Sequence, residues 1–112
     1  MIPLDGKEQM VTLLSTSATH IAFGTGTTPP NSEDTTLQTE IIRVAVSSFE
    51  TSGREISFLA TLSTAQGNGS ALSEIGLFTA SSGGIMIHRS TFITIDKTSS
   101  FSVNAKITLR FD

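Results

Sequence analysis

Polar and apolar residues alternate along the last stretch of the chain, from Phe101 to Phe111. Every odd position of this stretch is apolar and every even position is polar, which is the period of a β-strand with one face in a core and the other in water. No helix can use this alternation, so the pattern predicts a long C-terminal strand. Such a strand needs neighbouring strands along its edges and a second apolar layer over its inner face, and both must come from upstream.

Most upstream segments have the same two-residue period and are separated by Gly, Pro, Ser and Asn. Within residues 40–51 the apolar positions change parity between Val46 and Phe49, which predicts a β-bulge near Ser47 and Ser48. About seven short strands joined by such turns predict an all-β chain, a single-domain antiparallel β-sandwich or small barrel. The upstream strands are expected at residues 19–24, 40–51, 54–64, 71–79 and 84–88, with hairpin turns at 52–53 and 80–83. Residues 90–95 are expected to continue as a further strand or as a bent extension.

One short N-terminal helix is expected at residues 7–15, where Met10, Leu13 and Leu14 recur at helical spacing. Asp5 or Gly6 is placed to cap it. The domain, residues 1–112, therefore divides into an N-terminal helical segment (1–16) and a β domain (17–112). A further single helical turn is expected around Leu37.

The glycines and prolines of residues 24–34 predict a turn-rich loop, because glycine permits unusual backbone angles and proline cannot donate a ladder hydrogen bond. We expect this loop to be an attachment or inter-subunit surface; a plain connector between strands is the alternative. Shortening the loop is expected to leave the fold intact, because loop closure depends weakly on length. The candidate contact residues are Thr27, Thr28, Pro29 and Pro30.

A second group of apolar residues falls on the strand parity opposite to the core, where a lone soluble sandwich would place polar groups. Either the N-terminal helix covers them, or they form a subunit interface. The second alternative predicts a homo-oligomer, with a trimer favoured. These candidate interface residues are Ile41, Leu59, Phe78, Met86 and Phe92.

Composition narrows the classes of partner. Only 15% of the residues are charged and the net charge is −3, so no basic field is available for nucleic acid or an anionic membrane. The chain has no cysteine, which excludes disulfides and thiolate sites. It shows neither a secretory signal nor an apolar window long enough to span a bilayer, so we expect synthesis in a cytoplasm. Almost three residues in ten are Ser or Thr, which suits strands better than long helices.

No constellation of residues predicts catalysis, a cofactor or a metal. The two histidines, His20 and His88, are interpreted as strand-face residues, because neither has the spacing of a metal or catalytic pair. The sequence Gly24-Thr25-Gly26 superficially looks like a phosphate-binding loop, but no lysine follows at the required spacing. No serine lies in a nucleophile-elbow motif. The sequence therefore predicts a protein that is not an enzyme.

Glu74 is the charged residue that stands out, because it directly precedes an apolar stretch. Gly76, two residues later, leaves a gap where another backbone or side chain could approach closely. The alternative interpretation of Glu74 is a surface carboxylate that pairs across the sheet with Arg43 or Arg89.

Several segments between about Thr19 and the C-terminus form a recognisable set: Ile21 to Pro30, Leu37 to Glu40, Arg43, Ser73 to Phe78, Gly83 to Arg89, and Lys97-Thr98. In these segments the chain resembles small virion proteins of tailed bacteriophages, described as tail-fibre-like, tail-collar-like or head-associated. The resemblance implies a non-enzymatic structural role, as a β module attached to the phage particle. We expect an oligomeric module attached to the tail, in the fibre, collar or baseplate region, with other virion proteins as partners and the virion as its location. The alternatives are a capsid decoration, cement or head-fibre protein, and a receptor- or carbohydrate-binding module, although the Tyr and Trp that usually stack on sugars are missing.

Overall fold

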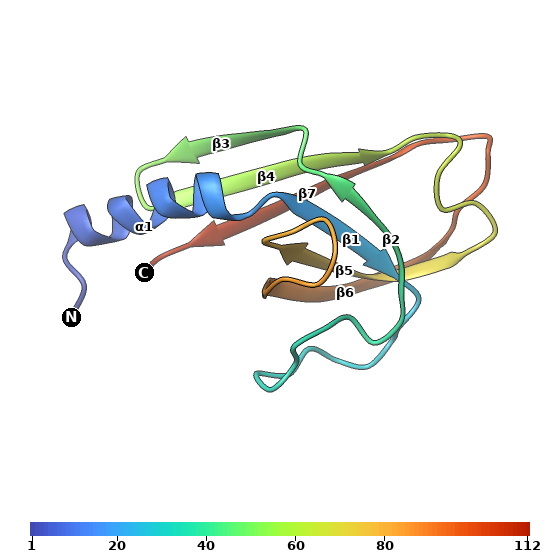
Figure 1. Ribbon diagram of the computed structural model, residues 1–112, viewed down its shortest axis with the longest axis horizontal. Coiled ribbons are helices and arrows are strands. Elements are labelled where there is room, and N and C mark those ends of the chain that lie inside the picture. The colour runs from blue at the N-terminus through green and yellow to red at the C-terminus, as the bar shows by residue number, and fades with distance from the viewer.

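The computed structural model describes residues 1–112 and shows one helix and seven strands (Figure 1). The elements are α1 (Leu4–Ser17), β1 (His20–Gly24), β2 (Glu40–Ala45), β3 (Ser48–Ser52), β4 (Glu55–Leu62), β5 (Ala71–Phe78), β6 (Met86–Asp96) and β7 (Val103–Arg110). They form a four-stranded sheet in the order β2-β1-β5-β6 and a three-stranded sheet in the order β3-β4-β7. Every strand pair is antiparallel. The predicted all-β sandwich with one short helix is confirmed.

The core lies between the two sheets, and the alternation of β4 and β7 supplies much of it. Ala105 and Ile107 of β7 are buried, so the inward face predicted for the C-terminal strand is confirmed. The strand is shorter than expected at its start: β7 begins at Val103, which pairs with Leu62, the last residue of β4. Phe101 precedes this pairing and is exposed. The fully buried residues of β4 are Ile56, Phe58, Ala60 and Leu62.

The predicted single strand over residues 40–51 is instead two strands in different sheets. The change occurs at two neighbouring residues: the Val46 N–H donates to the Thr19 carbonyl oxygen, whereas the Ser47 N–H donates to the Leu59 carbonyl oxygen. The parity change at Phe49 therefore marks a switch of sheet rather than a bulge within one strand. The β3–β4 hairpin is confirmed, and Gly53 occupies its turn with a φ of 60°.

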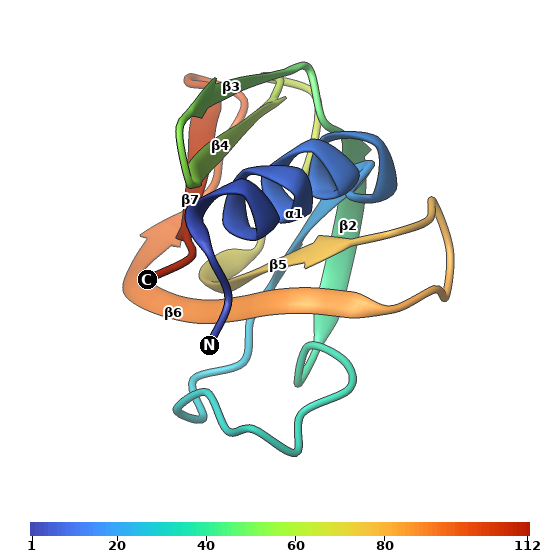
Figure 2. The same cartoon turned by 90° about the vertical axis from the view of Figure 1, so that its left-hand side faces the viewer.

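Helix α1 is longer than predicted and begins differently. It starts at Leu4 after Pro3, without a side-chain cap, so neither Asp5 nor Gly6 is the capping residue. Val11 is buried in the core cluster and Leu14 packs against it. The helix lies at the end of the molecule where both termini are found (Figures 1 and 2). It does not have the length and apolar character needed to cross a membrane.

The outer face of the four-stranded sheet is covered by the β1–β2 loop (residues 25–39), not by α1. Leu37 of this loop is buried in a small cluster with Ala22 and Phe78, and Met86 packs against the cluster. The loop contains turns and bends but no helical turn at Leu37, so that expectation is wrong. Gly76 makes this packing possible, because a Cβ atom at that position would lie 2.9 Å from the Leu37 side chain. The close approach predicted at Gly76 is confirmed.

Candidate functional site

The candidate site is centred on Glu74, which lies on β5 beneath the β1–β2 loop and is 0% exposed. One carboxylate oxygen accepts hydrogen bonds from the N–H groups of Gly26 and Thr39, each at 2.8 Å. The other accepts from the Gln38 N–H at 2.8 Å and from Arg89 Nε at 3.1 Å. A single carboxylate therefore holds both ends of the loop. Glu74 is not the surface residue of the alternative interpretation, although its pairing with Arg89 is observed.

The Gly24-Thr25-Gly26 sequence is explained by the close approach of this carboxylate. A Cβ atom on either glycine would lie 2.5 Å from Glu74 Oε2, well inside van der Waals contact. Glycine is thus needed so that the backbone can pass the carboxylate and donate to it. The turn that superficially looks like a phosphate-binding loop surrounds an anion of the chain itself.

Arg89, on β6, connects Glu74 to the tip of the loop. Its side chain is 4% exposed. Nη1 donates to Asp34 Oδ2 at 3.1 Å, and Nη2 donates to the Thr28 carbonyl oxygen at 2.9 Å. Arg89 lies directly opposite Gly76 of β5, where the missing side chain leaves room above the sheet. We call Glu74, Arg89 and Asp34 the loop lock.

The loop also carries its own internal hydrogen bonds. Gln38 Oε1 accepts from the N–H groups of Thr27 and Thr28 at 3.1 and 3.0 Å, and from Thr28 Oγ1 at 2.7 Å. Asn31 and Asp34 close a turn at the tip, where the Asn31 N–H donates to Asp34 Oδ2 at 2.9 Å. The backbone of the loop is therefore held in one shape by side chains at its base and at its tip.

The pKa of Glu74 reflects a balance between burial and hydrogen bonding. Burial by itself raises the pKa of a carboxyl group, but the N–H groups of Thr39, Gln38 and Gly26, together with Arg89, outweigh it and lower the pKa below 4.5. Glu74 is therefore ionised at neutral pH, with both oxygens engaged by donors. This arrangement stabilises a loop conformation and does not provide a general base.

A second cation fixes the β5–β6 turn on the same face of the sheet. Arg43 of β2 lies 3.7 Å above the centre of the Phe78 ring. Its Nη1 donates to the carbonyl oxygens of Ala80 and Gly83, each at 2.9 Å, and Nε and Nη2 pair with Glu40 at 3.1 and 2.8 Å. Arg43 therefore pairs with Glu40 and not with Glu74.

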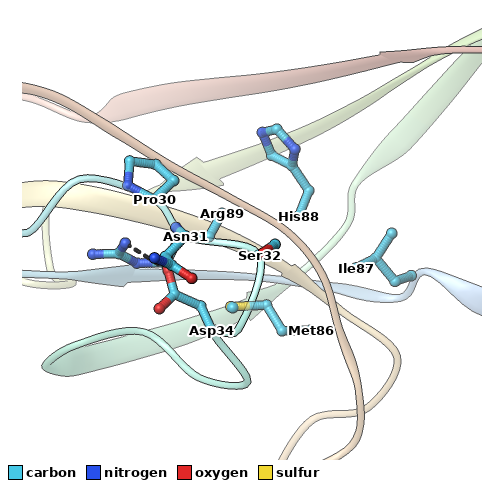
Figure 3. Close-up of a pocket in the computed structure, with 8 residues that line it drawn as sticks. All are labelled: Pro30, Asn31, Ser32, Asp34, Met86, Ile87, His88 and Arg89. Atoms are coloured by element: carbon cyan, nitrogen blue, oxygen red, sulfur yellow. Dashed lines mark hydrogen bonds and ion pairs between the residues drawn. The ribbon is translucent and has the colours of Figure 1, made fainter.

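A shallow groove of about 380 Å³ separates the loop tip from the start of β6. Figure 3 shows Asp34 and Arg89 facing one another on the loop side of β6, with His88 on the other side of the strand. Burial lowers the pKa of His88 below its usual 6.5. No group of three or more His, Cys, Asp or Glu side chains is placed to hold a metal ion. The groove is lined by Pro30, Asn31, Ser32, Asp34 and residues 86–89.

The predicted interface residues differ in exposure: some lie at the surface and others are buried. Thr27, Thr28, Pro29 and Pro30 are exposed on the loop. Of the five apolar candidates, Ile41 is 44% exposed, whereas Phe78 is buried under the loop. Leu59 and Met86 are half-buried.

Phe92 was placed on the wrong face by the sequence pattern, because it packs against the main core. The pairing shifts between Leu77–His88 and Phe78–Met86, so Ile87 is an extra residue on β6. A bulge of this kind reverses the parity of all later residues. Met86 is therefore outside the core and Phe92 inside it.

The sequence pattern missed the roles of Asp34 and Gln38 and the burial of Glu74. The signals in the sequence were Gly24 and Gly26 at a spacing of two and the gap at Gly76. These glycines indicate close packing, but they do not identify the residues that pack against them.

The fold and the site define a small β-sandwich with one long loop locked by buried charges. No family model matches the chain, and no curated protein matches it either.

Proposed function

We propose that the protein is a non-enzymatic structural component of a tailed-bacteriophage virion. It is an oligomeric β module attached to the tail, in the fibre, collar or baseplate region, and it contacts other virion proteins through the β1–β2 loop. The motifs quoted above support the virion assignment. The loop lock supports docking through this loop.

The loop lock is the observation that carries the proposal. A loop of about 15 residues without secondary structure is unusual in a small domain and is commonly functional. Here a buried ion pair and a set of backbone hydrogen bonds hold it in one shape. A surface that is ordered before binding loses less conformational entropy on binding, which favours a rigid docking surface over a plain connector.

Shortening the β1–β2 loop would disturb the loop lock. Replacing residues 27–32 by a short linker would remove the Thr28 carbonyl oxygen that accepts from Arg89 and would move Asp34. We therefore no longer expect a shortened loop to leave the fold intact. Substitutions of exposed side chains, as in Thr27→Lys combined with Ser32→Lys, change the surface and keep every contact of the loop lock.

The test is incorporation of these variants into virions of the phage that encodes the chain, measured by quantitative mass spectrometry of purified particles. We expect wild-type protein on the particles, reduced incorporation of the loop variant, and normal incorporation of the control, Thr64→Lys combined with Ser99→Lys, which alters two exposed loops elsewhere. Absence of the wild-type protein from purified virions would refute the virion role. Antibody labelling of the head instead of the tail would favour the capsid-decoration or head-fibre alternative.

A further inference from the structure

The four edge strands of the sandwich differ in how well they are protected against pairing with another chain. β2 and β6 contain register shifts in their pairing, and β3 has only five residues. Short strands, bulges and charged side chains are the usual devices that prevent edge-to-edge association. β7 is neither short nor bulged: its eight residues pair with β4 in an unbroken register, and they include no proline or glycine. Its two charges, Lys106 and Arg110, disfavour only the registers that set like charges directly opposite each other. β7 is therefore the one long, regular edge left open.

The free backbone groups on this edge can be identified. The Phe111 N–H donates to the Arg54 carbonyl oxygen at 2.9 Å, which continues the β4–β7 pairing by one residue. Backbone groups alternate in direction along a strand, so those of the odd-numbered β7 residues point toward β4. The N–H and C=O groups of the even-numbered residues point toward the open edge. These residues are Asn104, Lys106, Thr108 and Arg110, whose side chains are exposed.

We propose that β7 pairs antiparallel with β7 of a second copy of the chain, with Ile107 facing the partner's Ile107 across a two-fold axis. In this register Lys106 lies opposite the partner's Thr108, and Asn104 opposite the partner's Arg110. Every outward N–H and C=O group of the four residues then has a partner. Sliding the strands by one pairing step in either direction leaves an outermost pair beyond the end of the strand. The contact joins the two three-stranded sheets into one continuous sheet.

The side-chain charges favour the same register as the backbone hydrogen bonds. The two neighbouring registers place Lys106 opposite either the partner's Lys106 or the partner's Arg110, and like charges directly opposite are unfavourable. The proposed register avoids both pairings. Arg110 already has compensating carboxylates, since its Nε lies 2.8 Å from Asp112 and Glu55 is its pairing partner on β4.

On the inner face the same register sets small residues against large ones, with Ala105 opposite the partner's Leu109 and Val103 opposite the partner's Phe111. A strand that satisfies its own backbone groups and side chains in this way is self-complementary, as an isologous contact requires. This is why the occupant is a second copy rather than a strand of another protein. A two-fold pairing is complete with two copies, so the dimer replaces the trimer favoured from the sequence.

The proposal is tested first on the wild-type chain by sedimentation and hydrogen exchange over a concentration series. We expect a reversible dimer, and protection of the amides of Asn104, Lys106, Thr108 and Arg110 that increases with protein concentration. The odd-numbered amides of β7 should be protected at every concentration, because they bond to β4. A monomer at every concentration, a trimer, or a dimer that leaves the four amides unprotected would overturn the proposal.

Charge substitutions at Thr108 test the register itself. Thr108→Glu faces the partner's Lys106 and should tighten the dimer, whereas Thr108→Lys should weaken it, each by about two- to thirty-fold in Kd because the pair occurs twice per dimer. Ser57→Glu and Ser57→Lys are the matched controls. Ser57 is the β4 residue paired with Thr108, and the hydroxyl groups of the two residues form a hydrogen bond of 2.8 Å. Substitution of either residue therefore removes this bond and adds the same charge, but Ser57 lies one strand away from the open edge. A weaker dimer with Thr108→Glu would contradict the register, since that is the result expected if Thr108 faced itself.

Discussion

Removal of the Arg89 charge is expected to destabilise the fold by about 3 kcal/mol. Arg89→Met keeps an unbranched apolar stem but removes the guanidinium group, so Glu74, which is 0% exposed, is left without its counter-charge. Breaking a buried ion pair by removing one partner typically costs about 3–5 kcal/mol, because the other charge is left uncompensated. The three backbone N–H groups that still donate to Glu74 place the expected value at the lower end of that range.

Glu74→Gln tests the same pair from the other side. Each carboxylate oxygen accepts from two donors, so the NH₂ group of a glutamine faces two N–H groups in either orientation. We expect a loss of about 2–4 kcal/mol, since buried donors lose their acceptor. In Glu74→Gln combined with Arg89→Met neither charge remains, so the loss should be smaller than the sum of the two single losses by about 1–3 kcal/mol.

Urea denaturation of the wild type, the two single variants and the double variant measures these losses of unfolding free energy. The slope of the free energy against urea concentration should be the same for all four proteins, which checks that their unfolded states are comparable. Hydrogen exchange at Gly26, Gln38 and Thr39 provides the local readout, because these amides donate to Glu74. A loss below about 1 kcal/mol for Arg89→Met, or strictly additive single losses, would refute the reasoning, since a well-solvated pair behaves in that way.

Three further predictions follow from individual contacts. The pKa of Glu74 is lower in the folded protein than in the unfolded chain. The stability that its ionised carboxylate contributes is therefore complete above the unfolded pKa and is lost as pH falls through the folded pKa. In a pH titration, wild-type stability should fall below about pH 4.5, and Glu74→Gln should show a shallower loss. Gly76→Ala should cost about 1–3 kcal/mol in urea denaturation by displacing the leucine that covers it, and a neutral effect would mean that the loop shifts freely. Ile107→Ala should cost about 2–5 kcal/mol, whereas Thr108→Ala on the opposite face should cost about 1 kcal/mol or less; equal urea midpoints would contradict the face assignment of β7.

The parts of the fold that were predicted correctly are those that depend on local periodicity. The inward face of β4 and β7 follows from side-chain alternation, which is a property of any strand with one buried face. The turn at Gly53 and the gap at Gly76 follow from the conformational freedom and small size of glycine. These features need no knowledge of which strands are neighbours.

The features that were missed depend on pairing between distant segments. The switch of sheet between Val46 and Ser47 is visible in sequence only as a change of parity, which a bulge would produce equally well. The extra residue at Ile87 leaves no mark in the sequence, yet it turns Phe92 inward. Likewise, the burial of Glu74 depends on donors from residues 26, 38 and 39, which only the folded loop brings together.

Lys97 shows that the chain uses buried cations to fix loops at more than one place. It is 1% exposed, and its Nζ donates to Asn68 Oδ1 at 2.9 Å and to the Thr98 carbonyl oxygen at 2.8 Å. These contacts join the β4–β5 loop to the β6–β7 turn, at the end of the sandwich away from α1 (Figure 1). Since Arg43, Arg89 and Lys97 each hold a connection between strands, three of the seven Lys and Arg residues order loops instead of forming a charged surface. A chain without cysteine cannot fix its loops with disulfides, and a buried charge with several directed hydrogen bonds supplies a comparable geometric constraint. Because a buried cation is costly unless its donors are satisfied, each of these loops is tied to a single conformation, which is the property that a docking surface needs.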